Sequence, residues 1–181
     1  MTYKIILLGD SMVGKSSFVI RYIYQSIPPN QTPTIGAAMF SKNINTPNFK
    51  GHLNIWDTAG QERYKSLAPL YYRGAHIALI IYDITSETSF ENAKNNVEKL
   101  QNSENPIIAL IGNKTDLTAR TIDYDEAYNW AKENNIYFFE SSTKLPTDNS
   151  VNIIFDTLLK LLPSESPDSL TNTIQNNSKC C

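Results

Sequence analysis

The feature that most constrains the fold of this chain is an eight-residue stretch near its start. Residues Gly9–Ser16 read GDSMVGKS and fit the pattern G-x-x-x-x-G-K-[ST]. The apolar run Lys4–Leu8 before it is typical of a buried parallel strand, and Ser17–Ile23 after it has apolar residues at helical spacing. Because strand, glycine loop and helix start are the context that this pattern requires, we favour a phosphate-binding loop over a chance match in a glycine turn.

The residue types in this stretch suit phosphate binding. Gly9 and Gly14 allow a tight turn in which backbone N–H groups point at a phosphate, and the helix beginning near Lys15 adds the positive end of its dipole. The Lys15 ammonium can reach outer phosphate oxygens, and the Ser16 hydroxyl can bind Mg²⁺. The candidate phosphate-binding residues are Ser11, Val13, Gly14, Lys15, Ser16 and Ser17.

Strand-like apolar runs alternate with helical patterns along the chain. The alternation predicts an α/β fold with a mostly parallel sheet, helices on both of its faces, and ligands at the carboxyl ends of the strands. Asp123, with Glu126 three residues later, is the expected cap of the third helix. The expected strands are 3–9, 40–45, 52–57, 77–83, 107–112 and 137–141, and the expected helices are 15–24, 88–101, 123–134 and 150–162.

Length and composition indicate one domain over residues 1–162, followed by a disordered tail over 163–181 that is rich in Ser, Asn, Thr and Pro. The net charge of −2 gives no basic field for a nucleic-acid partner. No apolar run approaches the about 18 residues of a membrane span, and the chain enters its first strand at once, so we expect a cytosolic protein. Its two cysteines, Cys180 and Cys181, are neighbours at the chain end and cannot staple a core.

A second group of candidate residues follows the strand that ends at Trp56. An acidic residue at a strand end beside a phosphate loop, such as Asp57, can provide another Mg²⁺ contact, directly or through water. Gly60 lets the backbone approach a terminal phosphate, and Gln61 can orient an attacking water. Taken alone, these residues would more often mark an ordinary turn. Thr34 ends a proline-rich loop earlier in the chain.

A third motif, Asn113–Asp116, follows the fifth expected strand. The Asp116 carboxylate can accept paired hydrogen bonds from guanine, which offers N1–H and an exocyclic amine side by side, whereas adenine offers no such pair. The apolar stem of Lys114 can lie against a base face. Residues 140–144, after the sixth strand, can close the other side of the base. Alone, the motif would more often be a helix cap or turn, but after two phosphate-binding motifs it predicts a guanine nucleotide.

Together these residues resemble the Rab family of the Ras superfamily of small GTPases, over residues 3 to about 162 and the last two cysteines. The phosphate loop, Thr34 as the switch I threonine, Asp57–Gln61 as the start of switch II, and Asn113–Asp116 carry the superfamily resemblance. The Rab-like features are Trp56, Gln61–Tyr64 and Leu70–Ala75, and residues 34–38 and 66–72 are most similar to the early-endosomal branch.

The resemblance implies a three-layer phosphate-loop fold with a six-stranded sheet, and a GTP-binding, GTP-hydrolysing switch. It implies Mg²⁺ held near Ser16, Thr34 and Asp57, with Gln61 as the catalytic residue. Intrinsic turnover should be slow and stimulated by an activating protein that supplies an arginine. The implied nucleotide-binding residues, besides the phosphate loop, are Thr34, Gly60, Asn113, Lys114, Asp116, Ser142, Thr143 and Lys144.

The resemblance also implies partners and a location. The partners are an exchange factor, an activating protein, a GDP-dissociation inhibitor or escort protein, and effectors read by Met39, Trp56 and Tyr71; the protein itself is expected to be a monomer. Prenyl groups on Cys180 and Cys181 would anchor it to the cytosolic face of endomembranes, between which and the cytosol it would cycle, and endosomes are the expected compartment. Two lipid chains anchor stably, whereas one is marginal.

Four positions depart from the family pattern. Met12 replaces a small residue in the phosphate loop, where a positive φ would strain it and alter nucleotide exchange. Ile27 replaces an aromatic residue over the guanine, and Met39 replaces a phenylalanine of the effector-reading triad. Thr143 replaces an alanine, with a mild expected effect because its backbone N–H is the functional group.

Three alternatives stay open. A nucleotide kinase would share the phosphate loop but needs an acceptor pocket and usually an arginine-bearing lid, and the sequence has no lid-like insertion. A binding module held in one nucleotide state is favoured by Met12 and Ile27, whereas Thr34, Asp57 and Gln61 count against it. A GTPase without a lipid anchor would differ only in leaving the terminal cysteines unmodified.

Overall fold

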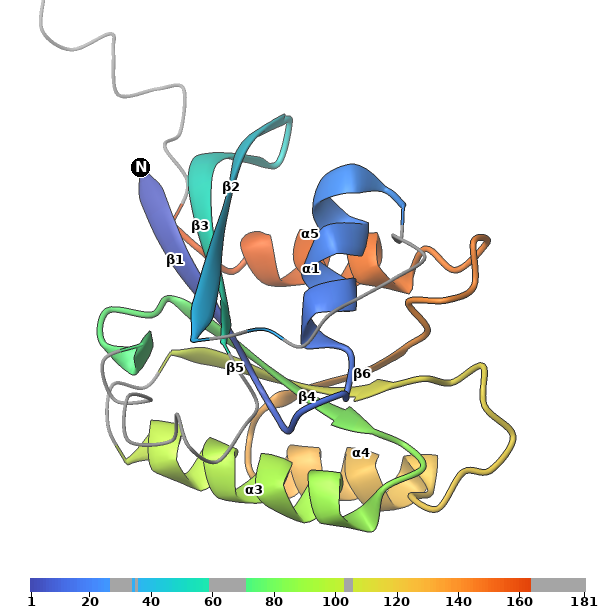
Figure 1. The fold of residues 1–181 in the computed structure, drawn as a ribbon. Coiled ribbons are helices and arrows are strands. Elements are labelled where there is room, and N and C mark those ends of the chain that lie inside the picture. The colour runs from blue at the N-terminus through green and yellow to red at the C-terminus, as the bar shows by residue number, and fades with distance from the viewer. Residues whose placement is uncertain (27–33, 35, 59–70, 103–105, 164–181) are drawn as a thin grey trace, which may run out of the picture.

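The computed structural model describes residues 1–26, 34, 36–58, 71–102 and 106–163. Within these residues, six strands and four helices follow one another along the chain (Figure 1). The strands are β1 (Thr2–Leu8), β2 (Ala37–Thr46), β3 (Phe49–Thr58), β4 (Ile77–Asp83), β5 (Ile107–Asn113) and β6 (Tyr137–Ser141), and the helices are α1 (Lys15–Tyr24), α3 (Glu87–Gln101), α4 (Tyr124–Glu133) and α5 (Ser150–Leu159).

The strands form one sheet in the order β2-β3-β1-β4-β5-β6. The β2–β3 pair is antiparallel, and all other pairs are parallel. The carboxyl ends of β1, β3, β4, β5 and β6 therefore lie along the same edge of the sheet, which is where ligands bind in folds of this type. The predicted class, a mostly parallel sheet between helices, is confirmed.

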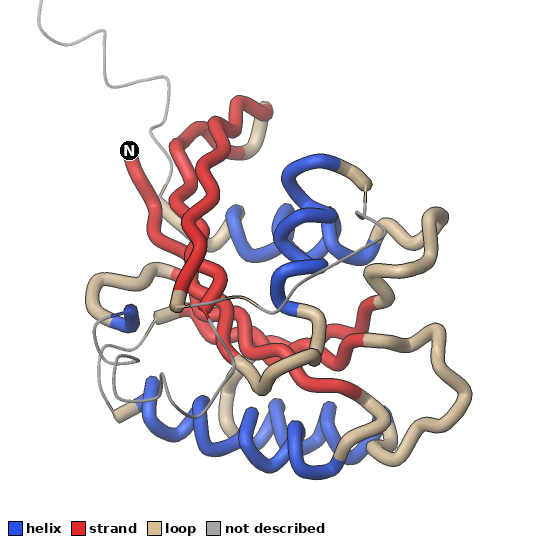
Figure 2. The backbone as a smooth tube through the Cα atoms, in the orientation of Figure 1, coloured by secondary structure: helices blue, strands red, loops and turns tan. Residues whose placement is uncertain are grey.

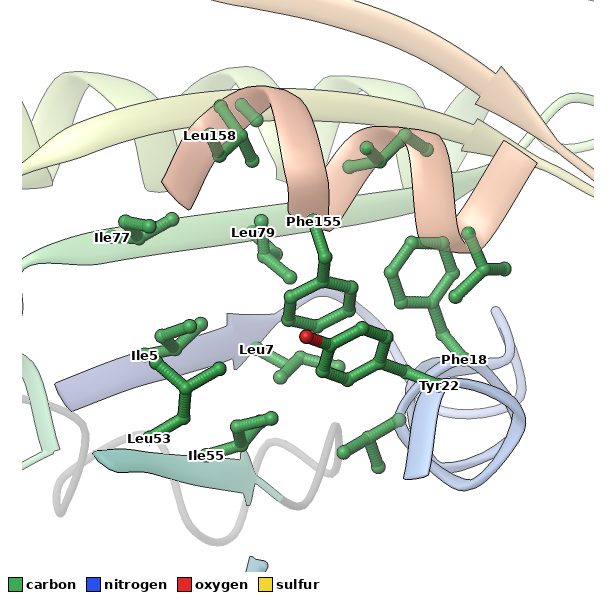
Figure 3. Close-up of a cluster of buried hydrophobic side chains, with 14 of the residues drawn as sticks. Ile5, Leu7, Phe18, Tyr22, Leu53, Ile55, Ile77, Leu79, Phe155 and Leu158 are labelled. Atoms are coloured by element: carbon green, nitrogen blue, oxygen red, sulfur yellow. The ribbon is translucent and has the colours of Figure 1, made fainter. Parts of the chain in front are cut away.

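Alternating apolar residues build the core on the face of the sheet that α1 and α5 cover (Figure 1). Ile5 and Leu7 of β1 point to this face, because successive side chains of a strand alternate between faces. Tyr22 of α1 stacks on Phe155 of α5, with ring centroids 3.6 Å apart and an interplanar angle of 8° (Figure 3). This stacking joins the helix that follows the phosphate loop to the last helix.

The intervening strand residues, such as Ile6 and Ile80, point to the opposite face and pack beneath α3 and α4. Phe90, Ala93 and Val97 of α3 are buried there at helical spacing. The sheet is therefore enclosed by two layers of helices, as the tube view in Figure 2 shows, and central strands such as β4 are buried along their whole length.

Several predicted boundaries differ from the structure. β3 begins at Phe49, earlier than expected, because the buried Phe49 ring packs against Tyr3 with centroids 5.4 Å apart. α5 ends at Leu159, before the expected residue 162, where two hydrogen bonds between residues three apart tighten its last turn. Asp123 is the N-cap of α4 by position, but its side chain makes no cap hydrogen bond, so the predicted capping interaction is wrong.

The lengths and hydropathies of the helices bear on membrane insertion. Among the residues that the structure describes, none of the helices combines the length and the apolar character that a bilayer span requires.

Candidate nucleotide site

The loop between β1 and α1 has the glycine-dependent geometry that the motif predicts. Gly9 and Gly14 have φ values of +139° and +100°, which side-chain-bearing residues rarely adopt. A Cβ atom at Gly9 would collide with the carbonyl oxygen of Ile81, and one at Gly14 would collide with the amide nitrogen of Asn113. Glycine is therefore required at both positions for conformational and for steric reasons.

Lys15, the first residue of α1, folds its side chain back over this loop. Its Nζ donates hydrogen bonds to the carbonyl oxygens of Gly9 at 2.9 Å and Asp10 at 2.6 Å. Burial lowers the pKa of Lys15 to about 8, although the nearby carboxylates of Asp57 and Asp10 favour the charged form. A buried ammonium that the loop itself orients is available to neutralise phosphate charge.

Three side-chain oxygens from distant segments meet next to Lys15. The Ser16 hydroxyl donates to Asp57 Oδ2 at 2.5 Å and lies 2.8 Å from the Thr34 hydroxyl, which in turn donates to Asp57 Oδ2 at 3.2 Å. These residues belong to the start of α1, the segment before β2, and the end of β3. The structure thus brings together the three residues predicted to surround Mg²⁺.

The surroundings of Asp57 show whether this oxygen cluster fits Mg²⁺. The residue is 1% exposed, and its Oδ1 atom accepts no hydrogen bond from the described part of the chain. Burial raises the pKa of Asp57, while hydrogen bonds from Ser16 and Thr34 and the charge of Lys15 oppose that rise. A hard cation that prefers oxygen ligands would satisfy the buried oxygen, so the residues present fit Mg²⁺.

Asn113 connects the phosphate loop to the predicted base-reading motif, Asn113–Asp116. Its amide nitrogen donates to the carbonyl oxygen of Val13 at 2.8 Å, across 100 positions of sequence, and the residue is 1% exposed. Its Oδ1 is buried without a hydrogen-bond partner in the described residues. Asn113 therefore supports the phosphate loop from β5.

Lys114 and Asp116 follow at the carboxyl end of β5. Lys114 has a φ of +71°, and its ammonium forms an ion pair of 2.6 Å with Asp83 at the end of β4. Asp116 accepts a 2.6 Å hydrogen bond from the Ser142 hydroxyl, which comes from the loop after β6. The predicted guanine-reading residues of two separate loops therefore meet at this edge of the sheet.

The remaining predicted site residues have varied positions. Val13 and Thr143 are buried, whereas Ser11 and Lys144 are exposed, and Met12 has a φ of +65° with 82% of its surface exposed. Met39 is also exposed and lies opposite Trp56 in the β2–β3 register, and the Trp56 ring is 6.2 Å from that of Tyr71. Gly60, Gln61, Ile27 and the two cysteines lie outside the described residues, so their roles stay predictions.

Some residues around the site were missed by the sequence interpretation. Asp83, which pairs with Lys114, has a signal that could have been used, because it is an acidic residue at the carboxyl end of a strand. Asn92 of α3 donates to the Asp10 carboxylate at 2.7 Å, and Arg120 forms a bidentate pair with Glu140 at 2.7 and 2.8 Å. These contacts join separate elements, so no local pattern predicts them.

A glycine loop before a helix, a buried lysine and an oxygen cluster beside it define a phosphate-loop nucleotide-binding protein. Comparison with protein families then identifies the class, because the Ras family model matches residues 4–164. The chain belongs to the Ras family. It is a GTPase that binds GTP and GDP with Mg²⁺ and hydrolyses GTP, and Ras-family GTPases generally interact with exchange factors, activating proteins and effectors.

Proposed function

We propose that this GTPase is a Rab-type switch that controls vesicle traffic on the endocytic route. The observation that carries the proposal is the surface formed by Met39, Trp56 and Tyr71. Met39 is 56% exposed on β2 and is paired with Trp56, whose ring neighbours Tyr71. Asp57 of the oxygen cluster directly follows Trp56, so this surface adjoins the nucleotide site and can respond to its state.

The hydrogen bonds of Thr34 support a switch that depends on the nucleotide. Thr34 is held by the Ser16 hydroxyl and the Asp57 carboxylate, which are the groups proposed to face Mg²⁺. Ligands at these groups therefore compete with or replace the contacts that hold Thr34. We propose that GTP and its metal order the segments around Thr34 and Gly60, and that hydrolysis releases them.

The arrangement of the site suggests a role in GTP hydrolysis for each residue. Bound Mg²⁺ supplies positive charge that stabilises the phosphate oxygens. Lys15 neutralises further phosphate charge, Ser16, Thr34 and Asp57 would hold the metal, and Gln61 orients the attacking water. Among the described residues, the hydrogen bonds of the oxygen cluster involve no arginine. We therefore expect slow intrinsic turnover, to which an arginine from an activating protein would add about 10³–10⁵ in rate.

Gln61→Leu tests the catalytic assignment. We expect it to reduce both intrinsic and stimulated GTP hydrolysis while leaving GDP affinity close to that of the wild type, because leucine cannot hydrogen bond to water. Single-turnover hydrolysis with and without an activating protein measures both rates. Unchanged rates in both assays would remove Gln61 from the mechanism.

The effector surface is tested by comparing partners of the two nucleotide states. Protein loaded with a non-hydrolysable GTP analogue should retain partners that GDP-loaded protein does not, and Trp56→Ala should lose them. Ile153→Ala is the matched control, since Ile153 is 54% exposed on α5, away from this surface. If Trp56→Ala and Ile153→Ala retain the same partners, the proposed surface is not the one that effectors read.

We propose that residues 163–181 form a tail that anchors the protein to membranes through prenyl groups on Cys180 and Cys181. Two lipid chains give a stable anchor, and a GDP-dissociation inhibitor or escort protein would be needed to return the protein from endosomal membranes to the cytosol. Mass spectrometry of the protein from its own cells should find both cysteines modified. A variant with both cysteines changed to serine should move from the membrane fraction to the soluble fraction; an unmodified, soluble wild type would contradict the anchor.

A second candidate function is a GTP-binding module that stays mainly in one nucleotide state. The positive φ of Met12, at the mouth of the phosphate loop, favours it, because a strained loop can change exchange or hydrolysis. GDP release and single-turnover hydrolysis distinguish the two. GDP release that takes longer than minutes, together with hydrolysis that an activating protein does not stimulate, would favour the module over the switch.

A further inference from the structure

The loop between β6 and α5 is organised by a carboxylate that belongs to none of the nucleotide-binding motifs. Asp148 accepts a hydrogen bond from the backbone N–H of Ser142 on Oδ2 at 2.9 Å, and another from the N–H of Ser150 on Oδ1 at 2.6 Å. Burial raises the pKa of Asp148, but these hydrogen bonds and the charge of Arg21 outweigh burial and hold the pKa below its ordinary value. The carboxylate is therefore ionised at neutral pH and ties the two ends of the loop together.

Ser142 connects this loop to Asp116, the residue proposed to read the base. Ser142 is fully buried, and its hydroxyl donates to Asp116 Oδ1 at 2.6 Å. The other oxygen of Asp116 accepts no hydrogen bond from the described residues, which leaves it available for a ligand. The direction of the Asp116 carboxylate thus depends on Ser142, and the position of Ser142 depends on Asp148.

Arg21 supports the same loop from the helix of the phosphate site. Its guanidinium donates to the carbonyl oxygens of Pro146 at 2.7 Å and Leu145 at 3.3 Å. Arg21 lies on α1, whose first two residues are Lys15 and Ser16. The loop is therefore held relative to the phosphate site as well as to Asp116.

We propose that Asp148 is a positioning residue for guanine discrimination, acting through Ser142 on Asp116. Asp116 must present an oxygen in the base plane to pair with the exocyclic amine, and a carboxylate free to rotate would lose much of that directional hydrogen bond. The inference rests on the proposed role of Asp116 in reading guanine. It predicts that a residue without ligand contact sets how strongly the site prefers guanine over a base that lacks the amine.

The experiment compares the affinities of the full chain for GDP and for inosine diphosphate, which lacks only the 2-amino group of guanine. Asp148→Asn keeps the side-chain volume but replaces one acceptor oxygen with a donor nitrogen, so it cannot accept both N–H groups. We expect it to lower the GDP preference about fivefold, on the scale of part of a charge-assisted hydrogen bond. Asp156→Asn, an equal charge change at an exposed position of α5, should leave the ratio unchanged.

The ratio separates positioning from a general loss of structure, because a loosened site weakens both nucleotides equally. A Ser142→Ala background provides a second check, since Asp148→Asn should add little to the ratio once the Ser142 hydroxyl is absent. If Asp148→Asn does not yield folded protein, Arg21→Gln replaces it, with an expected two- to threefold fall in the ratio from loss of the second support.

The outcomes distinguish this inference from the proposed role of Asp116 in reading guanine, on which it rests. An unchanged ratio in Asp148→Asn, or in Arg21→Gln where that variant stands in, overturns the inference if Asp116→Ala abolishes the preference. An unchanged ratio in Asp116→Ala overturns both, because Asp116 then does not read the amine. A fall in the ratio for Asp148→Asn and Asp116→Ala, but not for Asp156→Asn, supports the inference.

Discussion

Asn113 donates a 2.8 Å hydrogen bond to the carbonyl oxygen of Val13, and its amide nitrogen fills the space that a Cβ atom on Gly14 would need. The start of the base-reading motif and the phosphate loop are therefore one packed unit, although they are 100 positions apart in sequence. A ligand that binds both its base and its phosphates here meets two surfaces whose relative position is already set, which lowers the entropic cost of ordering them.

Asn113→Ala should loosen this unit. The change leaves the Val13 carbonyl without its partner, and we expect the free energy of unfolding to fall by about 1–3 kcal/mol and GDP release to accelerate. Urea unfolding and the release of a fluorescent GDP analogue measure the two effects. Asn129→Ala, at an exposed position of α4, is the control, and an equally small effect of both variants would contradict the proposed support.

Met12→Gly should relieve backbone strain. Met12 has a φ of +65°, where a side chain costs energy that glycine does not, and its exposed side chain contributes little burial. We expect the free energy of unfolding to rise by up to about 1 kcal/mol, the gain being reduced by the greater freedom of glycine in the unfolded chain. Met12→Leu should give no gain in urea unfolding; a gain equal to that of Met12→Gly would exclude backbone strain as the cause.

Removal of Mg²⁺ should act through Asp57. Chelation with EDTA should speed GDP release from the wild type, because the buried Asp57 oxygen and the phosphates lose the shared cation. Asp57→Asn should release GDP at least about tenfold faster without chelation and respond little to EDTA. Asp125→Asn, at an exposed position of α4, should behave as the wild type in the same fluorescence assay. A full EDTA response in Asp57→Asn would show that the metal is held elsewhere.

Asp83 should stabilise the folded protein more at neutral pH than at acidic pH. Burial raises the pKa of Asp83, but hydrogen bonds from Lys114 and Thr85 outweigh it and hold the pKa below the ordinary value of 3.8. Because the folded-state pKa is depressed, the stabilisation is present above the unfolded-state pKa and is lost as the pH falls through the folded-state value. The difference in free energy of unfolding between the wild type and Asp83→Asn should therefore be largest above about pH 5 and shrink below that. A difference that does not vary with pH would contradict the ion pair.

Much of the fold was predictable because buried positions appear in the sequence as apolar residues in runs or at regular spacing. The apolar run of β4 predicted its bounds correctly, since both of its faces are covered. β3 was predicted too short because Phe49 is separated from the apolar run by Lys50 and Gly51, and only its contact with Tyr3 explains its burial. The cap at Asp123 was predicted by residue type, and the side chain does not make the bond.

By itself, the sequence determined the order of strands and helices along the chain and the glycine loop, because each is a local pattern of burial or backbone freedom, and it predicted which residues would bind a nucleotide. Only the tertiary structure decided that Ser16, Thr34 and Asp57 share hydrogen bonds, that Met12 has a positive φ, and that Ser142 is hydrogen bonded to both Asp148 and Asp116. The physical reason is that contacts between the ends of neighbouring strands depend on sheet order and register, and no single stretch of sequence contains either.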